Sequence, residues 1–82
     1  MMKLPRGLSG ETLVRRLARL GYRVLRRHGS HAVLETDQAG GHLCFVAMHD
    51  SIKPGTLGDT LKDVAQHHGL SMDELLRQLD LR

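Results

Sequence analysis

The sequence predicts an α+β two-layer sandwich, in which a three-stranded antiparallel sheet is covered on one face by helices. Apolar residues recur at helical spacing in residues 10–20 and again in 57–68 and 72–79. Between the first two of these segments lie three short runs of strand-forming residues, separated by glycine-containing turns. With 82 residues, the chain is expected to form one domain, residues 1–82.

A first helix is expected over residues 10–20, because its apolar residues fall on one face of a helix. Ser9 is placed to cap its N-terminus through the side-chain hydroxyl. Gly21 is placed to end it, since glycine readily takes the left-handed conformation that terminates helices. The apolar stripe comprises Leu13, Val14, Leu17 and Leu20.

Three strands are expected over residues 22–27, 31–36 and 42–48, joined by a turn at 28–30 and a loop at 37–41. The third strand is apolar nearly throughout, which is typical of a central strand or one buried on both faces. Alternation assigns the side chains of the other two strands to faces. The first strand places Tyr22, Val24 and Arg26 opposite to Arg23, Leu25 and Arg27, and the second places His31, Val33 and Glu35 opposite to Ala32, Leu34 and Thr36.

Two helices are expected after the strands. Thr56 is expected to cap a helix that ends at His68, with Asp59 at its third position in a capping-box-like arrangement. Residues 71–74 (Ser-Met-Asp-Glu) form a full capping box at the start of a third helix. The buried stripe of the longer helix is expected to comprise Leu57, Leu61, Val64 and Ala65.

Composition excludes several classes of protein. No apolar run is long enough to span a membrane, and the N-terminus lacks the apolar stretch of a signal peptide. The single cysteine, Cys44, excludes an intramolecular disulfide and is compatible with the cytoplasm. Tyr22 and Phe45 are the only aromatic residues, so a base-stacking platform for single-stranded nucleic acid is not expected.

Charge is unevenly distributed along the chain, although the net charge is only +3. Residues 6–27 contain seven arginines and one acid, Glu11, whereas acids outnumber lysine and arginine from Glu35 onward. A basic first third indicates a polyanion or an acidic protein as partner. The arginines of the first helix can equally be a solvated face or a track for RNA phosphates.

The candidate catalytic residue is His31, which follows the turn formed by His28, Gly29 and Ser30. An imidazole titrates near neutral pH and can take or give a proton. Ser30, Arg27 and the backbone of Gly29 can hold a phosphate beside it, and His28 is a possible auxiliary group. The alternative is a histidine that begins a strand and makes only a structural hydrogen bond.

A second candidate phosphate site lies at residues 53–56, where Lys53 and Thr56 precede a helix whose first N–H groups are free. A plain capped loop is an equal alternative. His49 lies just before this loop and is a possible auxiliary group or a surface histidine. No metal or cofactor is expected, since His28 and His31 are separated by a turn and the chain contains no His-Glu-x-x-His pattern.

Several short segments occur in the order and spacing of one known family. They are Leu-Gly-Tyr at 20–22, Gly-Ser-His at 29–31, His49, Lys-Pro-Gly-Thr-Leu at 53–57, and Gly-Leu-Ser at 69–71 with Glu74 and Leu75. Through them the chain resembles the HicA-type mRNA interferase toxins of bacterial type II toxin–antitoxin systems.

The resemblance implies a double-stranded-RNA-binding-domain-like fold and a cytoplasmic ribonuclease that cleaves mRNA. It implies that the histidine of the Gly-Ser-His triplet, here His31, is essential. It also implies a neutralising HicB-type antitoxin as partner. Two hypotheses follow for the chain. It is a metal-independent endoribonuclease toxin, or it is a non-catalytic RNA-binding or protein-interaction module on the same fold.

Overall fold

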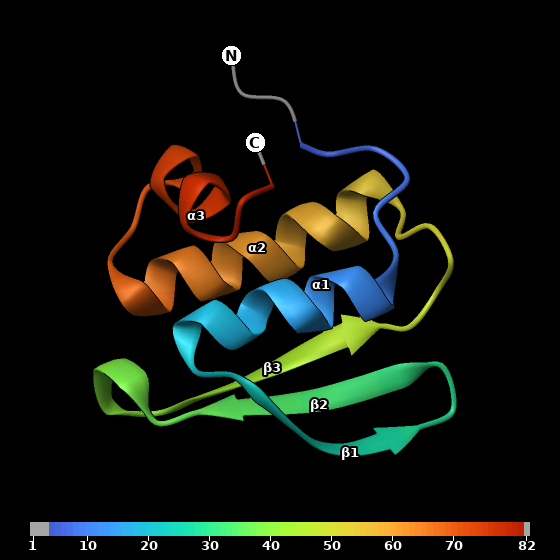
Figure 1. The fold of residues 1–82 in the computed structure, drawn as a ribbon, viewed down its shortest axis with the longest axis horizontal. Helices are drawn as coiled ribbons and strands as arrows, with labels where there is room; N and C mark the ends of the chain where they lie inside the picture. The colour runs from blue at the N-terminus through green and yellow to red at the C-terminus, as the bar shows by residue number, and fades with distance from the viewer. Residues whose placement is uncertain (1–3, 82) are drawn as a thin grey trace.

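The structure is a computed structural model that describes residues 4–81 (Figure 1). The predicted α+β two-layer sandwich is confirmed, and the order of elements is consistent with a double-stranded-RNA-binding-domain-like topology. Helices α1 and α2 lie side by side over one face of the sheet, and α3 packs against α2 (Figure 1). The elements are α1 (Gly10–Leu17), η1 (Ala18–Leu20), β1 (Arg23–His28), β2 (His31–Thr36), η2 (Gln38–Gly40), β3 (His42–Ala47), α2 (Pro54–His68) and α3 (Met72–Gln78).

One hydrophobic core lies between the helices and the sheet. The predicted stripe of α2 is confirmed, because the buried residues of that helix are the four expected ones. Cys44 is buried in the same core, and burial together with the charge of Asp63 raises the pKa of its thiol to about 12. Within residues 4–81, no helix is long and apolar enough to cross a membrane. The fully buried side chains include Leu13, Leu17, Leu34, Val46, Leu57, Leu61, Val64, Leu75, Leu76 and Leu79.

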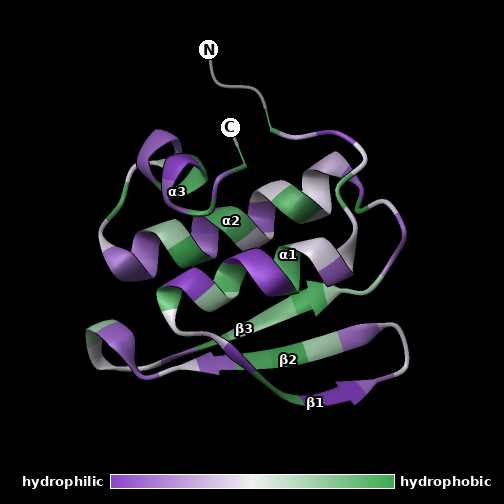
Figure 2. Ribbon diagram, in the orientation of Figure 1, coloured by the Kyte–Doolittle hydropathy of each residue, from purple (hydrophilic) through white to green (hydrophobic). Residues whose placement is uncertain are grey.

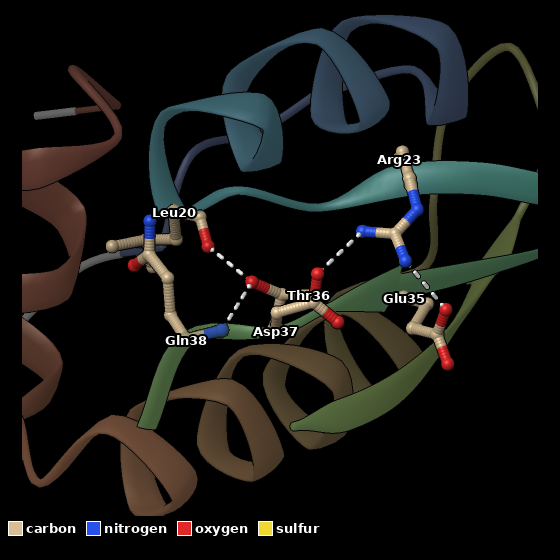
Figure 3. Close-up of polar contacts among 6 residues, drawn as sticks. All are labelled: Leu20, Arg23, Glu35, Thr36, Asp37 and Gln38. Atoms are coloured by element: carbon tan, nitrogen blue, oxygen red, sulfur yellow. Dashed lines mark hydrogen bonds and ion pairs between the residues drawn. The ribbon is translucent and has the colours of Figure 1, made fainter. Parts of the chain in front are cut away.

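The first helix begins as expected, and the helical segment ends at Gly21 as expected, but its last turn, η1, is a 3-10 helix. The Ser9 hydroxyl accepts the backbone N–H of Thr12 at 3.1 Å, and Gly21 has a φ of 81°. A Cβ on Gly21 would also lie 2.8 Å from Oγ1 of Thr36, so both the backbone angle and the available space require glycine. The buried Thr36 hydroxyl donates to the carbonyl of Leu20 at 2.7 Å and accepts the N–H of Gln38 (Figure 3). The bond from Thr36 to Leu20 joins the end of β2 to the end of η1.

The sheet has the order β1-β2-β3, so β2 is the central strand and β3 lies at an edge. The expectation that the third strand is central or buried on both faces is therefore wrong. Leu43 and Phe45 of β3 are 46% and 60% exposed on the face away from the helices. Hydrophobic colouring extends along β3 and the middle of β2, whereas the end of β1 is hydrophilic (Figure 2). The apolar sequence of β3 thus provides one face to the core and another to solvent.

A β-bulge at Leu25 changes the faces predicted for β1. Val24 pairs with Leu34, but the next pair is Arg26 with Val33, which leaves Leu25 as an extra residue. Beyond the bulge, Arg27 pairs with Ala32 of β2. Directly opposed residues share a face, so Arg27 lies on the helix-covered side and Arg26 on the open side. The strict alternation expected over residues 22–27 is therefore wrong after Leu25.

The start of α2 also differs from the prediction. The helix begins at Pro54, two residues before the expected Thr56 cap, and its N-cap is Lys53, which makes no side-chain capping bond. Proline suits the first helical position, because its φ is preset and that position needs no N–H. Thr56 therefore lies inside the first turn. The end of the helix at His68 and the capping box of α3, built from Ser71 and Glu74, are confirmed.

A buried tyrosine and three histidines join the other end of the sheet to α2. The Tyr22 hydroxyl, in a residue only 4% exposed, lies 2.7 Å from Nδ1 of His42 and 3.0 Å from Nε2 of His68. Nε2 of His42 lies 3.1 Å from the Asp63 carboxylate, and the His67 ring stacks on His42 with centroids 4.4 Å apart. The buried hydroxyl of Tyr22 therefore has two hydrogen-bond partners, enough for it both to donate and to accept a hydrogen bond. We call these five residues the tyrosine–histidine cluster.

The core assignment predicts the effect of Leu61→Ala. Leu61 is fully buried between α2 and the sheet, so its truncation should lower the free energy of unfolding by about 2–5 kcal/mol. Chemical denaturation of the two proteins measures the difference. A loss below about 0.5 kcal/mol, the size of a surface substitution, would contradict the burial of this face of α2.

The tyrosine–histidine cluster predicts acid sensitivity. Burial and the neighbouring His67 and His42 lower the pKa of His68 from its ordinary 6.5, so below that pH the unfolded chain binds a proton that the folded chain does not. Stability should be retained above pH 6.5 and fall as the pH drops below it. Denaturation of His68→Gln above and below this pH should show a weaker dependence. His28→Gln, at an exposed position, is the control. If it weakens the pH dependence of stability as much as His68→Gln does, that dependence does not arise from His68.

Candidate active site

The turn between β1 and β2 is tighter than the predicted one. His28 belongs to β1 and pairs directly with His31, so only Gly29 and Ser30 form the turn. Gly29 has a φ of 60° at the first turn position, where a type II′ hairpin turn favours glycine. The carbonyl of Ser30 accepts the backbone N–H of Met48 at 2.7 Å. The turn is therefore hydrogen-bonded to the chain leaving β3, while residues 28–31 all stay exposed.

Close contact between α1 and the end of β3 holds the same corner. The N–H of Gly10, the first residue of α1, donates to the carbonyl of His49 at 2.9 Å. A Cβ on Gly10 would lie 2.7 Å from Cα of Met48 and closer still to the carbonyl oxygen of Ala47, so only glycine fits. This packing role was not predicted; its one signal in the sequence is a glycine that opens an amphipathic helix. The contact fixes the backbone of His49 near the turn and leaves its side chain exposed.

His31 lies on the face of the sheet that no helix covers, which we call the open face. The strand register arranges this face in three rows across the sheet. His31 is in the row at the turn, and Val33 is in the middle row. The rows are His28, His31 and Ala47; Arg26, Val33 and Phe45; and Arg23, Glu35 and Leu43.

Arg27 does not lie beside His31. Its guanidinium makes two hydrogen bonds of 2.9 Å to the carboxylate of Glu11 in α1, on the helix-covered side of the sheet. This bidentate pair lowers the pKa of the Glu11 carboxyl. Arg27 thus joins β1 to the start of α1, and the structure does not bring it together with Ser30 and His31 as a phosphate ligand.

Arg26 is the cation that the structure places next to His31. It lies in the adjoining row of the open face, is exposed, and has no hydrogen bond or ion pair with any residue from 4 to 81. Arg23, in the last row, is instead paired with Glu35 at 2.8 Å and with Asp37 at 3.5 Å (Figure 3). The free guanidinium of Arg26 therefore remains available to an anion that approaches His31.

The predicted phosphate site at residues 53–56 lies at the same end of the molecule as the turn (Figure 1). Lys53 and Thr56 are exposed, and the carbonyl of Lys53 accepts the N–H of Leu57 at 2.9 Å in the first turn of α2. Between residues 4 and 81, no hydrogen bond or ion pair joins the side chain of Lys53 or Thr56 to the turn. The turn and residues 53–56 therefore lie at the same end of the fold but form two separate surfaces.

Three of the six histidines lie away from this corner. His42 begins β3 and His31 pairs with its last residue, so the tyrosine–histidine cluster lies about 17 Å along the strand from His31. In the part of the chain that the structure describes, no group of three or more His, Cys, Asp or Glu side chains is arranged to hold a metal ion. The sequence did not predict the cluster, because its members are distant in the chain.

The corner combines three chemical functions on exposed, backbone-anchored groups. The imidazole of His31 can transfer a proton, the hydroxyl of Ser30 can donate a hydrogen bond, and the guanidinium of Arg26 can bind an anion. Because His31 lies on the central strand, pairing on both sides holds its backbone rigidly. The arrangement suits proton transfer beside a bound phosphate.

Comparison with known proteins identifies one family. The model of the family described as the HicA toxin of bacterial toxin–antitoxin systems matches residues 10–65, from the start of α1 through most of α2. No curated protein and no solved structure matches the chain significantly. The matched segment includes the turn, the open face and the loop before α2. Because this match covers more than half of the 82 residues, the chain belongs to the HicA toxin family.

Proposed function

We propose that residues 1–82 form a single toxin domain that acts as a metal-independent endoribonuclease on mRNA in the cytoplasm, with His31 as its catalytic residue. Membership of the HicA toxin family supports the toxin role. The single observation that carries the site is the position of His31, exposed on the central strand next to the unpaired guanidinium of Arg26. An imidazole can transfer a proton, and of the histidines near the turn, His31 is the one on the central strand, whose backbone is paired on both sides.

RNA supplies the nucleophile for its own cleavage. The 2′-oxygen forms a bond to phosphorus as the bond to the 5′-oxygen breaks, and the 2′-OH proton must leave while the 5′-oxygen gains one. His31 takes the first proton or gives the second, because its imidazole is exposed on a strand that is paired on both sides. Negative charge develops on the phosphate oxygens during this step. Donors fixed in advance around the phosphate stabilise that charge.

The residues around His31 divide the phosphate contacts between two surfaces. Arg26, the Ser30 hydroxyl and the backbone of Gly29 hold the phosphate that is cleaved, and the exposed His28 and His49 are auxiliary groups beside it. Lys53 and Thr56 contact a phosphate further along the RNA, where the N-terminus of α2 adds its dipole. Arg27 is replaced by Arg26 in this assignment, because Glu11 already occupies its guanidinium.

HicA toxins pair with an antitoxin, and we propose that the partner of this chain is an acidic HicB-type protein that covers the turn and the start of α1. The first third of the chain carries seven arginines, so charge complementarity would speed association. A cover over His31 would exclude RNA without changing the fold of the toxin.

One observation favours the alternative function, a non-catalytic domain that only binds another protein. Leu43 and Phe45 are large apolar side chains that are exposed on the same face of the sheet.

The catalytic assignment predicts the behaviour of His31→Ala. This variant should lose RNA cleavage while its thermal unfolding and its affinity for RNA change little, because His31 is exposed and makes no side-chain bond with residues 4–81. His28→Ala, across the turn, is the matched control and should retain most activity. Cleavage should persist in EDTA. Undiminished cleavage by His31→Ala would refute its role, and loss of cleavage in EDTA would refute metal independence.

The bulge in β1 predicts different effects for two neighbouring arginines. In a His31→Ala background that leaves RNA intact, Arg26→Gln should weaken RNA binding and lower the slope of log affinity against log salt by about 1. Arg27→Gln should leave the slope nearly unchanged, because its charge is already paired with Glu11. Binding titrations over a range of salt concentrations give both slopes. Equal slopes for the two variants would contradict the assignment of Arg26 to the phosphate.

A further inference from the structure

Phe45 has the most exposed large apolar side chain of the described residues. It is 60% exposed, compared with 50% for Leu25 and 46% for Leu43. The other aromatic residue, Tyr22, is buried in the tyrosine–histidine cluster. A phenylalanine left this exposed forgoes the stabilisation that burial of its apolar surface would give. The position of this exposed ring is therefore informative.

The register places Phe45 next to the proposed catalytic histidine. Phe45 pairs with Val33, and His31 pairs with Ala47, two residues further along β3. His31 and Phe45 are therefore diagonal neighbours on one face of an antiparallel pair, where such positions are about 7–8 Å apart. Arg26 pairs with Val33 from the other side. The middle row of the open face thus contains a cation, a small apolar residue and an aromatic ring, all beside His31.

We infer that Phe45 is a stacking platform for an unpaired base of the substrate RNA, adjacent to the phosphate that is cleaved at His31. This inference rests on the proposed function and names its substrate class as single-stranded RNA. A single strand presents flat apolar bases and anionic phosphates in alternation, which matches the ring of Phe45 and the guanidinium of Arg26. Stacking on an aromatic side chain accepts every base, because each has a π-face.

Duplex RNA does not fit this surface. Its bases are stacked on one another inside the helix, so none is free to lie on an exposed ring. The sequence-based expectation against base stacking relied on the small number of aromatic residues. The structure instead places the one exposed aromatic ring beside His31, and stacking of a single base requires only one.

Leu43 provides a matched control on the same strand. It lies on the same face two residues before Phe45 and is also exposed, but it belongs to the last row, beside the Arg23–Glu35 ion pair. A general apolar docking surface for protein would use both residues. A base platform would use Phe45 alone, since only a ring stacks on a base and only Phe45 adjoins His31.

The first test compares cleavage of a single-stranded RNA oligonucleotide by the wild-type protein, Phe45→Ala, Phe45→Trp and Leu43→Ala. Phe45→Ala should lower kcat/KM by about tenfold or more, as expected for the loss of one stacked base. Phe45→Trp should retain activity and Leu43→Ala should change it little. In addition, wild type should prefer single-stranded to duplex RNA, and Phe45→Ala should lose much of that preference. No change in Phe45→Ala, or an equal loss in Leu43→Ala, would overturn the inference.

A second measurement separates this inference from the proposed function. The chain contains no tryptophan, so Phe45→Trp introduces a single indole fluorophore. In the His31→Ala background, single-stranded RNA should quench its fluorescence, whereas duplex RNA should not. If single-stranded RNA quenches the fluorescence but the wild-type protein does not cleave RNA, the proposed ribonuclease activity is refuted and base stacking on Phe45 is supported. Cleavage without quenching, or loss of antitoxin binding in Phe45→Ala with normal cleavage, would refute the platform and make this face a protein-docking surface.

Discussion

One extra residue in β1 determines which charge faces His31. Without the bulge at Leu25, uninterrupted pairing would place Arg27 directly opposite His31 and would turn Arg26 toward the helices. With it, Arg26 lies on the open face and Arg27 reaches Glu11 at the start of α1. The bulge leaves Leu25 unpaired and places the two adjacent arginines on opposite faces of the sheet, where they have separate partners. The position of α1 on β1 and the charge at the site depend on the same irregularity.

Local sequence signals were sufficient for most of the fold. The spacing of Leu13, Leu17 and Leu20 fixed the buried side of the first helix, and the Ser71–Glu74 capping box marked the start of the last one. These signals act within one or two turns of chain, so they need no knowledge of the partner elements. The two-layer arrangement follows from them, because each apolar face must be covered by another.

The errors arose where distant parts of the chain decide the outcome. Leu25 is an ordinary strand residue, and only its pairing with β2 shows that it is the extra one. Thr56 is a good N-cap by itself, but Pro54 starts the helix earlier. For the candidate site, the sequence indicated the exposed turn with Ser30 and His31. It did not show that Arg27 is paired with Glu11 or that Phe45 shares the open face with His31. The register between strands decides which residues share the open face. Register depends on how two strands pair, so the sequence of one strand alone does not determine it.

The free edge of β1 has a further consequence. An edge strand offers unpaired N–H and C=O groups to any other strand, which is the usual route to aggregation by sheet extension. Arg23, Arg26 and Arg27 make the edge strand cationic, and the bulge twists it out of regular pairing. A second strand that approached this edge would meet the unpaired guanidinium of Arg26 and a strand bent by the bulge. The strand that carries Arg26 onto the open face is therefore poorly suited to extend the sheet by pairing with another strand.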